Sequence, residues 1–241
     1  MFIFLHIPKT AGMSFRKAMR DEFAPQGDLA HPPSGPDRCR GLGGGLMNRS
    51  GGSAVADNHI ELANARERMQ ALQADVRGKL EIVWGHFCFG VHEAIDGDCR
   101  YITILRDPVE RAISHYNMVR HESGKSGNDD IIPYFIDNAY ELSNLQTRLL
   151  SNTVCGTITH EHVGIAIDNL EKWFDIIGTR ERYADFLQAV RAKYGWACAN
   201  YHLHVALSKP ELSDDVRHQI SEMNVFDNML YERARVGGLF I

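Results

Sequence analysis

A short stretch near the start of the chain combines a lysine, two hydroxyl residues and a glycine. It follows the apolar run 2–7, and a helical pattern begins near Ser14. The first backbone N–H groups of a helix have no intrahelical partner, so they bind anions well. Lys9 adds a positive charge, Thr10 adds a hydroxyl donor, and Gly12 lets the backbone approach a ligand closely. These residue types in this order predict a phosphate-binding loop.

The position of the lysine separates this loop from the common nucleotide loop. That loop reads GxxxxGK[ST], with the lysine directly after a glycine, whereas Lys9 precedes Gly12 by three residues. An alternative interpretation is an ordinary turn that carries a solvated lysine.

A second segment with anion-binding features begins with the apolar run 101–105, which predicts a buried strand. Asp107 then takes the N-cap position of a helix. Arg106 stands at the end of the strand, where its guanidinium can form a bidentate pair with a second phosphate, and Ser114 can add a hydroxyl. In the alternative interpretation, Arg106 pairs only with Asp107 or Glu110.

Histidine suits the role of a general base because its unperturbed pKa is about 6.5. Of the 12 histidines in the chain, His86 directly follows a predicted strand, which makes it the first candidate. The alternative is a core histidine with its hydrogen bonds satisfied. His92 and His115 are weaker candidates. The HxH pairs at 160–162 and 202–204 lack a nearby carboxylate or cysteine pattern, so we predict no metal site.

Strand-like runs alternate with helical patterns along the chain, at 2–7, 80–85, 101–105 and 174–178. This alternation predicts an α/β fold, a three-layer sandwich with a central, mainly parallel sheet flanked by helices. Ligands of such sheets bind beyond the carboxyl ends of the strands. The lysine loop, His86 and Arg106 all stand at such ends, so we expect them to meet in one crevice.

The composition or pattern of three further segments predicts their structure. Residues 24–53 are rich in glycine and proline, which predicts a flexible segment with no packed element, either a lid or disordered chain. Residues 54–77 have a helical pattern. A last long helix is expected from an N-cap at Ser213 to Gly237.

Several of these blocks resemble one enzyme family. HIPKTAGMSF (6–15) is similar to the 5′-phosphosulfate loop of the sulfotransferases, in the branch of the heparan sulfate 2-O- and 6-O-sulfotransferases and bacterial carbohydrate sulfotransferase relatives. ILRDPVERAISHY (104–116) is similar to the 3′-phosphate segment of the same family. Further similar blocks follow in the family order, at 84–87, 144–151, 168–187 and 223–234.

The resemblance implies a P-loop-like fold and a sulfotransferase activity. Such an enzyme moves a sulfuryl group from 3′-phosphoadenosine 5′-phosphosulfate (PAPS) to an acceptor hydroxyl and releases 3′-phosphoadenosine 5′-phosphate (PAP), without a metal. His86 matches the catalytic base of the family, and Lys9 would stabilise the leaving oxygen. The residues expected to bind the donor are Lys9, Thr10, Ala11, Gly12, Met13, Ser14, Arg106, Ser114, Arg180 and Lys209.

The chain departs from the family pattern at two positions. Met13 stands where the family usually has a threonine or serine, so one hydroxyl contact to the donor is missing. Trp84 stands where the 2-O-enzymes have a second histidine, so a paired-histidine mechanism is not expected.

Composition is that of a single enzyme domain spanning residues 1–241. The net charge of −5 argues against a nucleic-acid binder, which normally shows a basic excess. No apolar run is long enough to span a membrane and no charged leader is visible, so we expect a cytoplasmic protein. The expected partner is a carbohydrate or small-molecule acceptor with a hydroxyl group; its identity and the oligomeric state are not indicated.

Two other functions remain open from the sequence. One is a nucleotide-dependent kinase or NTPase, although the GK[ST] order and an acidic metal-binding strand end are missing. The other is a non-catalytic module that binds a nucleotide without turnover.

Overall fold

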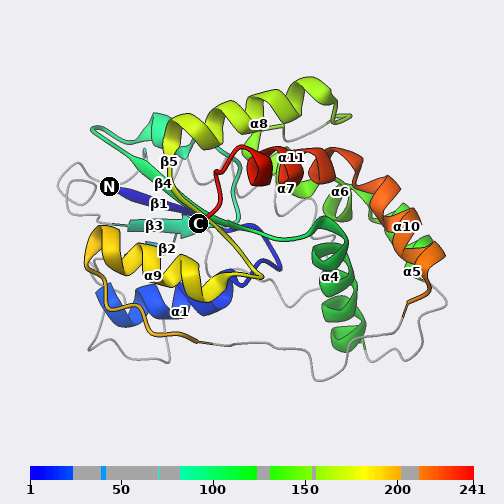
Figure 1. The fold of residues 1–241 in the computed structure, drawn as a ribbon, viewed down its shortest axis with the longest axis horizontal. Helices are drawn as coiled ribbons and strands as arrows, with labels where there is room; N and C mark the ends of the chain where they lie inside the picture. The colour runs from blue at the N-terminus through cyan, green and yellow to red at the C-terminus, as the bar shows by residue number, and fades with distance from the viewer. Residues whose placement is uncertain (24–38, 42–69, 71–81, 124–130, 154–155, 202–211) are drawn as a thin grey trace.

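A computed structural model describes residues 1–23, 39–41, 70, 82–123, 131–153, 156–201 and 212–241. Five strands form one sheet in the order β2-β3-β1-β4-β5, and every neighbouring pair is parallel (Figure 1). The strands are β1 (Phe2–Leu5), β2 (Cys39–Gly41), β3 (Ile82–Gly85), β4 (Arg100–Leu105) and β5 (Phe174–Thr179). The predicted α/β fold with a parallel sheet is confirmed.

Helices cover both faces of the sheet. The described helical elements are α1 (Gly12–Phe23), the 3₁₀ turn η1 (Val91–Ala94), α4 (Pro108–Ser123), α5 (Ile131–Asp137), α6 (Ala139–Leu142), α7 (Leu145–Leu150), α8 (His160–Trp173), α9 (Tyr183–Tyr194), α10 (Asp214–Met223) and α11 (Val225–Val236). Within the described ranges, none of these helices is long and apolar enough to cross a membrane.

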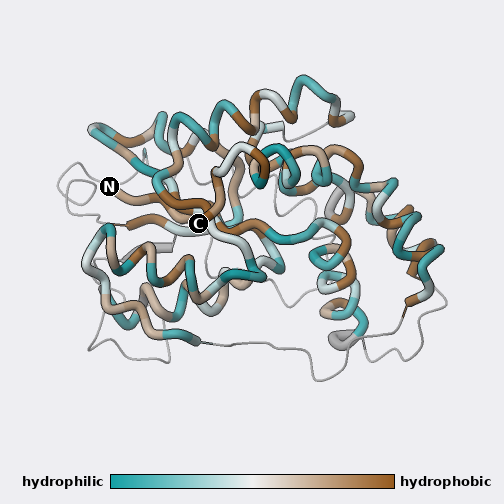
Figure 2. Tube along the Cα trace, in the orientation of Figure 1, coloured by the Kyte–Doolittle hydropathy of each residue, from teal (hydrophilic) through white to brown (hydrophobic). Residues whose placement is uncertain are grey.

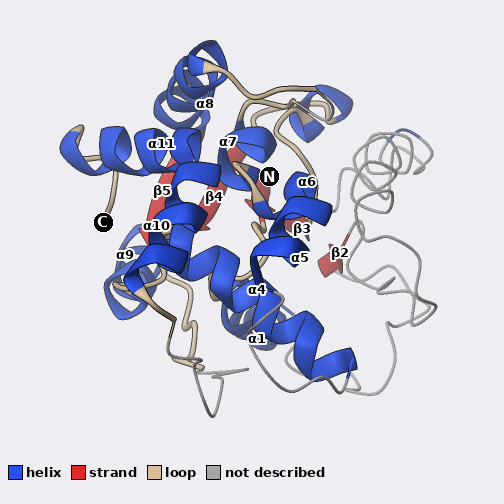
Figure 3. Cartoon of the chain, turned by 90° about the vertical axis from the view of Figure 1, so that its right-hand side faces the viewer, coloured by secondary structure: helices blue, strands red, loops and turns tan. Residues whose placement is uncertain are grey.

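Side chains of β1 alternate between two apolar clusters, as the two-residue period of a strand requires. Ile3 and Leu5 pack with residues of α7, α8 and α11, and Phe4 packs on the other face with residues of α1 and α9. Because β1 is buried on both faces, it reads as a continuous apolar run (Figure 2). A third cluster joins α4, α5, α6 and α10 beside the sheet (Figure 3).

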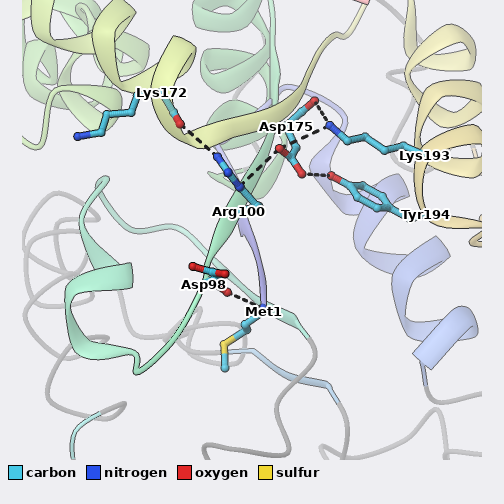
Figure 4. A network of polar contacts seen from close by, with 7 residues as sticks. All are labelled: Met1, Asp98, Arg100, Lys172, Asp175, Lys193 and Tyr194. Carbon is cyan, nitrogen blue, oxygen red and sulfur yellow. Dashed lines mark hydrogen bonds and ion pairs between the residues drawn. The ribbon is translucent and has the colours of Figure 1, made fainter.

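The amino ends of β4 and β5 are linked to α9 by a polar network (Figure 4). Asp175 accepts a hydrogen bond from the Tyr194 hydroxyl at 2.9 Å and forms ion pairs with Lys193 at 3.5 Å and Arg100 at 3.9 Å. Arg100 also donates to the Lys172 carbonyl at 3.3 Å. These contacts hold α9 against the sheet at the edge opposite to the carboxyl ends of the strands.

The structure differs from the sequence expectations in two elements. Within 24–53, where no packed element was expected, Cys39–Gly41 forms β2 and pairs with Ile82–Trp84; edge pairing uses the main chain and needs no apolar pattern. The expected last helix begins as predicted at Ser213, whose hydroxyl accepts from the Val216 N–H at 3.4 Å, but it breaks at Asn224.

The break at Asn224 has a side-chain cause. The buried amide of Asn224 donates to the Ile220 carbonyl at 2.9 Å and accepts from the Asn144 N–H at 3.0 Å. The chain therefore bends where α10 and α11 meet the start of α7. The expected helix at 54–77 lies outside the described residues, apart from Gln70.

Candidate active site

The loop between β1 and α1 has an alternating backbone conformation. Lys9 and Ala11 have positive φ angles of 71° and 72°, whereas Thr10 and the helical Gly12 are not in that region. Alternation of left- and right-handed conformations turns successive N–H groups toward one side and forms an anion-binding hollow. Positive φ angles are uncommon outside glycine, so the surrounding structure must hold this shape. The positive φ angles at Lys9 and Ala11 are the part of such a conformation that the structure shows.

Hydrogen bonds within the loop involve the hydroxyl of Thr10 and the main chain of Ser14. The Thr10 hydroxyl donates to the Ile7 carbonyl at 2.9 Å, and Thr10 is fully buried. Its hydrogen therefore supports the loop, contrary to the expectation that it would point to a ligand. The N–H groups of Ser14 and Phe15 donate to the Ala11 carbonyl at 3.0 and 3.3 Å, which starts α1 directly after the loop.

Gly12 is required by His6, not only by a ligand. A Cβ atom at position 12 would lie 1.9 Å from Cδ2 and 2.0 Å from Nε2 of the His6 ring. No side chain fits in that space while the ring stays in place. Close approach of an anion is the reason expected for this glycine, and the packing of the histidine is a second reason.

His86 and His6 lie side by side because their strands are neighbours. The register of β1 and β3 pairs Leu5 with Gly85, so the next residue on each strand extends past the same edge. The two imidazole rings are 4.1 Å apart between centroids, and Nδ1 of His86 is 2.7 Å from the His6 carbonyl oxygen. Because a carbonyl oxygen can only accept, Nδ1 carries the hydrogen, and Nε2 of neutral His86 has a free lone pair.

Sequence reasoning assigned no role to His6. A second imidazole does lie beside His86, but it comes from β1 and not from position 84. The contact follows from the register of β1 and β3, which no pattern within either strand specifies.

Burial and neighbouring charges keep both rings neutral. The pKa of His86 is lowered to about 4, mainly by burial and also by the charges of Arg16 and His115, while the hydrogen bond to His6 opposes the shift. Burial also lowers the pKa of His6 well below its ordinary value, assisted by the charges of His86, Arg16 and Lys9. At neutral pH, His86 therefore offers an uncharged nitrogen that can accept a proton.

Arg106 directly contacts the lysine loop. Its Nη1 donates to the Lys9 carbonyl at 3.0 Å, and its Nη2 is 3.8 Å from a carboxylate oxygen of Glu110. The two segments expected to hold separate phosphates are thus joined to each other. The charge of Arg180 lies close enough to lower the pKa of Arg106, although burial of Arg106 is the larger cause.

The remaining residues of the two expected anion-binding segments have the following surroundings. Asp107 caps α4 as predicted, since its carboxylate accepts from the Glu110 N–H at 2.9 Å. Ser114 is half-buried on α4, and the Arg180 N–H donates to the Leu105 carbonyl at 2.8 Å. Met13, on the first turn of α1, is 41% exposed. Lys209 lies outside the described residues.

Among the described histidines, His92 and His162 have structural contacts, and the expected pair at 202–204 lies outside the described residues. His92 contacts the Tyr101 hydroxyl at 3.0 Å and packs 4.1 Å from the Trp173 ring. His162 accepts from the Thr159 N–H at 3.0 Å at the start of α8. Among the residues that the structure describes, no group of three or more histidine, cysteine, aspartate or glutamate side chains is arranged to hold a metal ion.

Comparison with known proteins adds no family to this picture. No protein-family model matches the chain, and no curated protein matches it. Any functional assignment therefore depends on the geometry of the loop, the two histidines and Arg106.

Proposed function

We propose that this chain is a PAPS-dependent sulfotransferase with a P-loop-like fold, acting on a hydroxyl of a carbohydrate or another small molecule. One observation carries the proposal: the half-buried, neutral imidazole of His86 lies against His6, whose ring packs on Gly12 of the candidate phosphate loop, at the carboxyl edge of neighbouring parallel strands. Group transfer from an anionic donor to a hydroxyl needs both parts. The sheet order also supports it, because the loop follows the central strand β1.

The residues around the loop suit a donor with two anionic ends. Backbone N–H groups of residues 9–13 and the Lys9 ammonium would hold the 5′-phosphosulfate. Arg106, with Ser114 and Arg180, would hold the 3′-phosphate. A phosphate there would replace Glu110 as the partner of the Arg106 Nη2. The bound donor supplies the sulfuryl group that is transferred.

His86 performs the proton transfer in this proposal. Its Nε2 accepts the hydroxyl proton, and the resulting imidazolium keeps its Nδ1–H bonded to the His6 carbonyl. A negative charge bound at the loop would raise the pKa of His86 from about 4 toward neutrality, which makes it a stronger base when the donor is present. General base catalysis typically contributes about 10²–10⁴-fold to the rate.

Lys9 provides the complementary charge. Its ammonium would stabilise the negative charge that develops on the leaving phosphate oxygen, an effect of about 10²–10³-fold for one positioned group. The carbonyl of the same residue is fixed by Arg106. Lys9, which follows β1, and His86, which follows β3, would thus act from the ends of two neighbouring strands.

Calorimetric titration of the purified chain with PAP, against ATP with magnesium, tests the proposal. We expect micromolar binding of PAP and none of ATP. Lys9→Ala should abolish PAP binding, and Lys172→Ala, at the opposite edge of the sheet, should leave it unchanged. The reverse preference would indicate a kinase-like enzyme, and binding of neither nucleotide would refute the donor assignment.

A further inference from the structure

The side-chain amide of Gln146 forms two hydrogen bonds with the main chain of Arg106. Its side-chain Oε1 accepts from the Arg106 N–H at 3.1 Å, and its Nε2 donates to the Arg106 carbonyl at 2.9 Å. β4 ends at Leu105. At the next residue, Arg106, the side-chain amide of Gln146 makes the two main-chain hydrogen bonds that a neighbouring strand would make within a sheet. Gln146 is fully buried on the first turn of α7.

Gln146 is itself fixed by Asp227 of α11. The carboxylate of Asp227 accepts from the Gln146 N–H at 3.0 Å and from the Thr147 N–H at 2.7 Å. Asp227 is fully buried, and the charge of the equally buried Arg111 partly offsets the cost of its burial. The start of α7 is therefore held rigidly relative to the core.

One series of hydrogen bonds then runs from α11 to the candidate phosphate loop. It passes from Asp227 to Gln146, from Gln146 to the Arg106 main chain, and from the Arg106 guanidinium to the Lys9 carbonyl. The last bond acts on a residue with a positive φ angle, which needs support from its surroundings. Gln146 lies in the middle of this series.

We propose that Gln146 is a positioning residue for the donor site. It fixes the main chain where β4 ends, so that the Arg106 side chain reaches the Lys9 carbonyl and keeps the loop in its anion-binding form. This role rests on the proposed function for its ligand. Its mechanical part, the support of residues 6–15, is independent of the ligand's identity.

Gln146→Leu tests the role, because leucine fills a similar volume without either hydrogen bond. We expect PAP to bind about 10-fold more weakly, and hydrogen exchange in residues 6–15 to become faster. Asn169→Leu is the matched control: it removes another side-chain hydrogen bond to α7, from Asn169 to the Leu150 carbonyl at 2.8 Å, at the opposite end of this helix from Gln146. That variant should lose thermal stability but keep the PAP affinity and the exchange rate of residues 6–15.

A double-mutant cycle distinguishes positioning from general destabilisation. If Gln146 acts through Arg106, then Gln146→Leu should change PAP affinity less than about 2-fold in an Arg106→Ala background. A full 10-fold effect in that background would overturn the proposal. Wild-type exchange of residues 6–15 in folded Gln146→Leu would overturn it as well, whatever ligand binds.

Gln146→Glu provides a milder variant if the leucine variant does not fold. A protonated glutamate restores one donor and one acceptor, so PAP affinity relative to wild type should recover as the pH falls. A ratio independent of pH would contradict the role. Failure of the wild-type chain to bind PAP would refute the proposed donor, and the exchange experiment would still decide the positioning role.

Discussion

Gly12→Ala is the substitution whose effect the structure defines most sharply. The new Cβ would lie 1.9 Å from Cδ2 of His6, so ring and helix must separate by about 1.5 Å to reach ordinary van der Waals contact. His6 is only 4% exposed and packs between Phe4 and His86, with ring centroids at 5.4 and 4.1 Å. The ring therefore cannot move aside without disturbing His86.

Two opposing contributions set the size of the effect. Overpacking in a buried site costs about 1–3 kcal/mol. Replacing a helical glycine by alanine gains about 0.5–1 kcal/mol, and Gly12 has no positive φ angle that would oppose it. We expect the variant to lose about 1–2 kcal/mol of unfolding free energy, a drop of roughly 2–8 °C in Tm for a domain of this size.

Urea denaturation measures the expected loss of unfolding free energy. Gly164→Ala in α8 is the matched control, because nothing lies within 4 Å of its Cβ position, and it should be slightly stabilising. In a His6→Ala background, Gly12→Ala should also become stabilising, since the ring it meets is gone. Equal stability of Gly12→Ala and wild type would refute the packing argument.

Four further outcomes are expected. His86→Asn should lower turnover about 100-fold or more while PAP affinity stays close to wild type, and normal turnover would exclude His86 as the base. Addition of PAP should raise the pKa of His86 in an NMR titration above its value of about 4, and an unchanged pKa would place the anion elsewhere. At pH values between about 4 and about 6.5, His86 is protonated in the unfolded chain but neutral in the folded protein. The unfolding free energy should therefore fall as the pH decreases from about 6.5 to about 4. His86→Phe should reduce that slope in urea denaturation at a series of pH values. Asp227→Ala should cost about 3–5 kcal/mol in the same assay, because the buried N–H groups of Gln146 and Thr147 lose their acceptor and Arg111 loses a nearby negative charge. A loss below about 1 kcal/mol would contradict this role of Asp227.

Elements with strong local signals could be predicted from the sequence. The apolar runs at 101–105 and 174–178 form β4 and β5 with ends shifted by a residue, and Asp107 caps the next helix. Their patterns are local: apolar continuity for buried strands, and a carboxylate three residues before an N–H donor.

Features that depend on tertiary pairing could not be predicted. The contact of His6 with His86 requires the β1–β3 register, which no single-strand pattern specifies. Gln146 looks like any polar residue at the start of a helix, and its role exists only because α7 starts beside the end of β4. The break at Asn224 likewise comes from Asn144, distant in sequence, and overrides a continuous helical pattern.

The hydrogen bond from His86 Nδ1 to the His6 carbonyl determines which ring nitrogen of His86 carries the hydrogen. Because the acceptor is a main-chain oxygen, this choice does not depend on the side chain at position 6. Many histidine bases are oriented by a carboxylate, which carries a charge and can itself be protonated. Here the orienting group is an uncharged main-chain oxygen that every amino acid at position 6 would supply. Residue 6 could therefore be varied to change the packing around the proposed base, while the main chain still determines that Nε2 is the unprotonated nitrogen of His86.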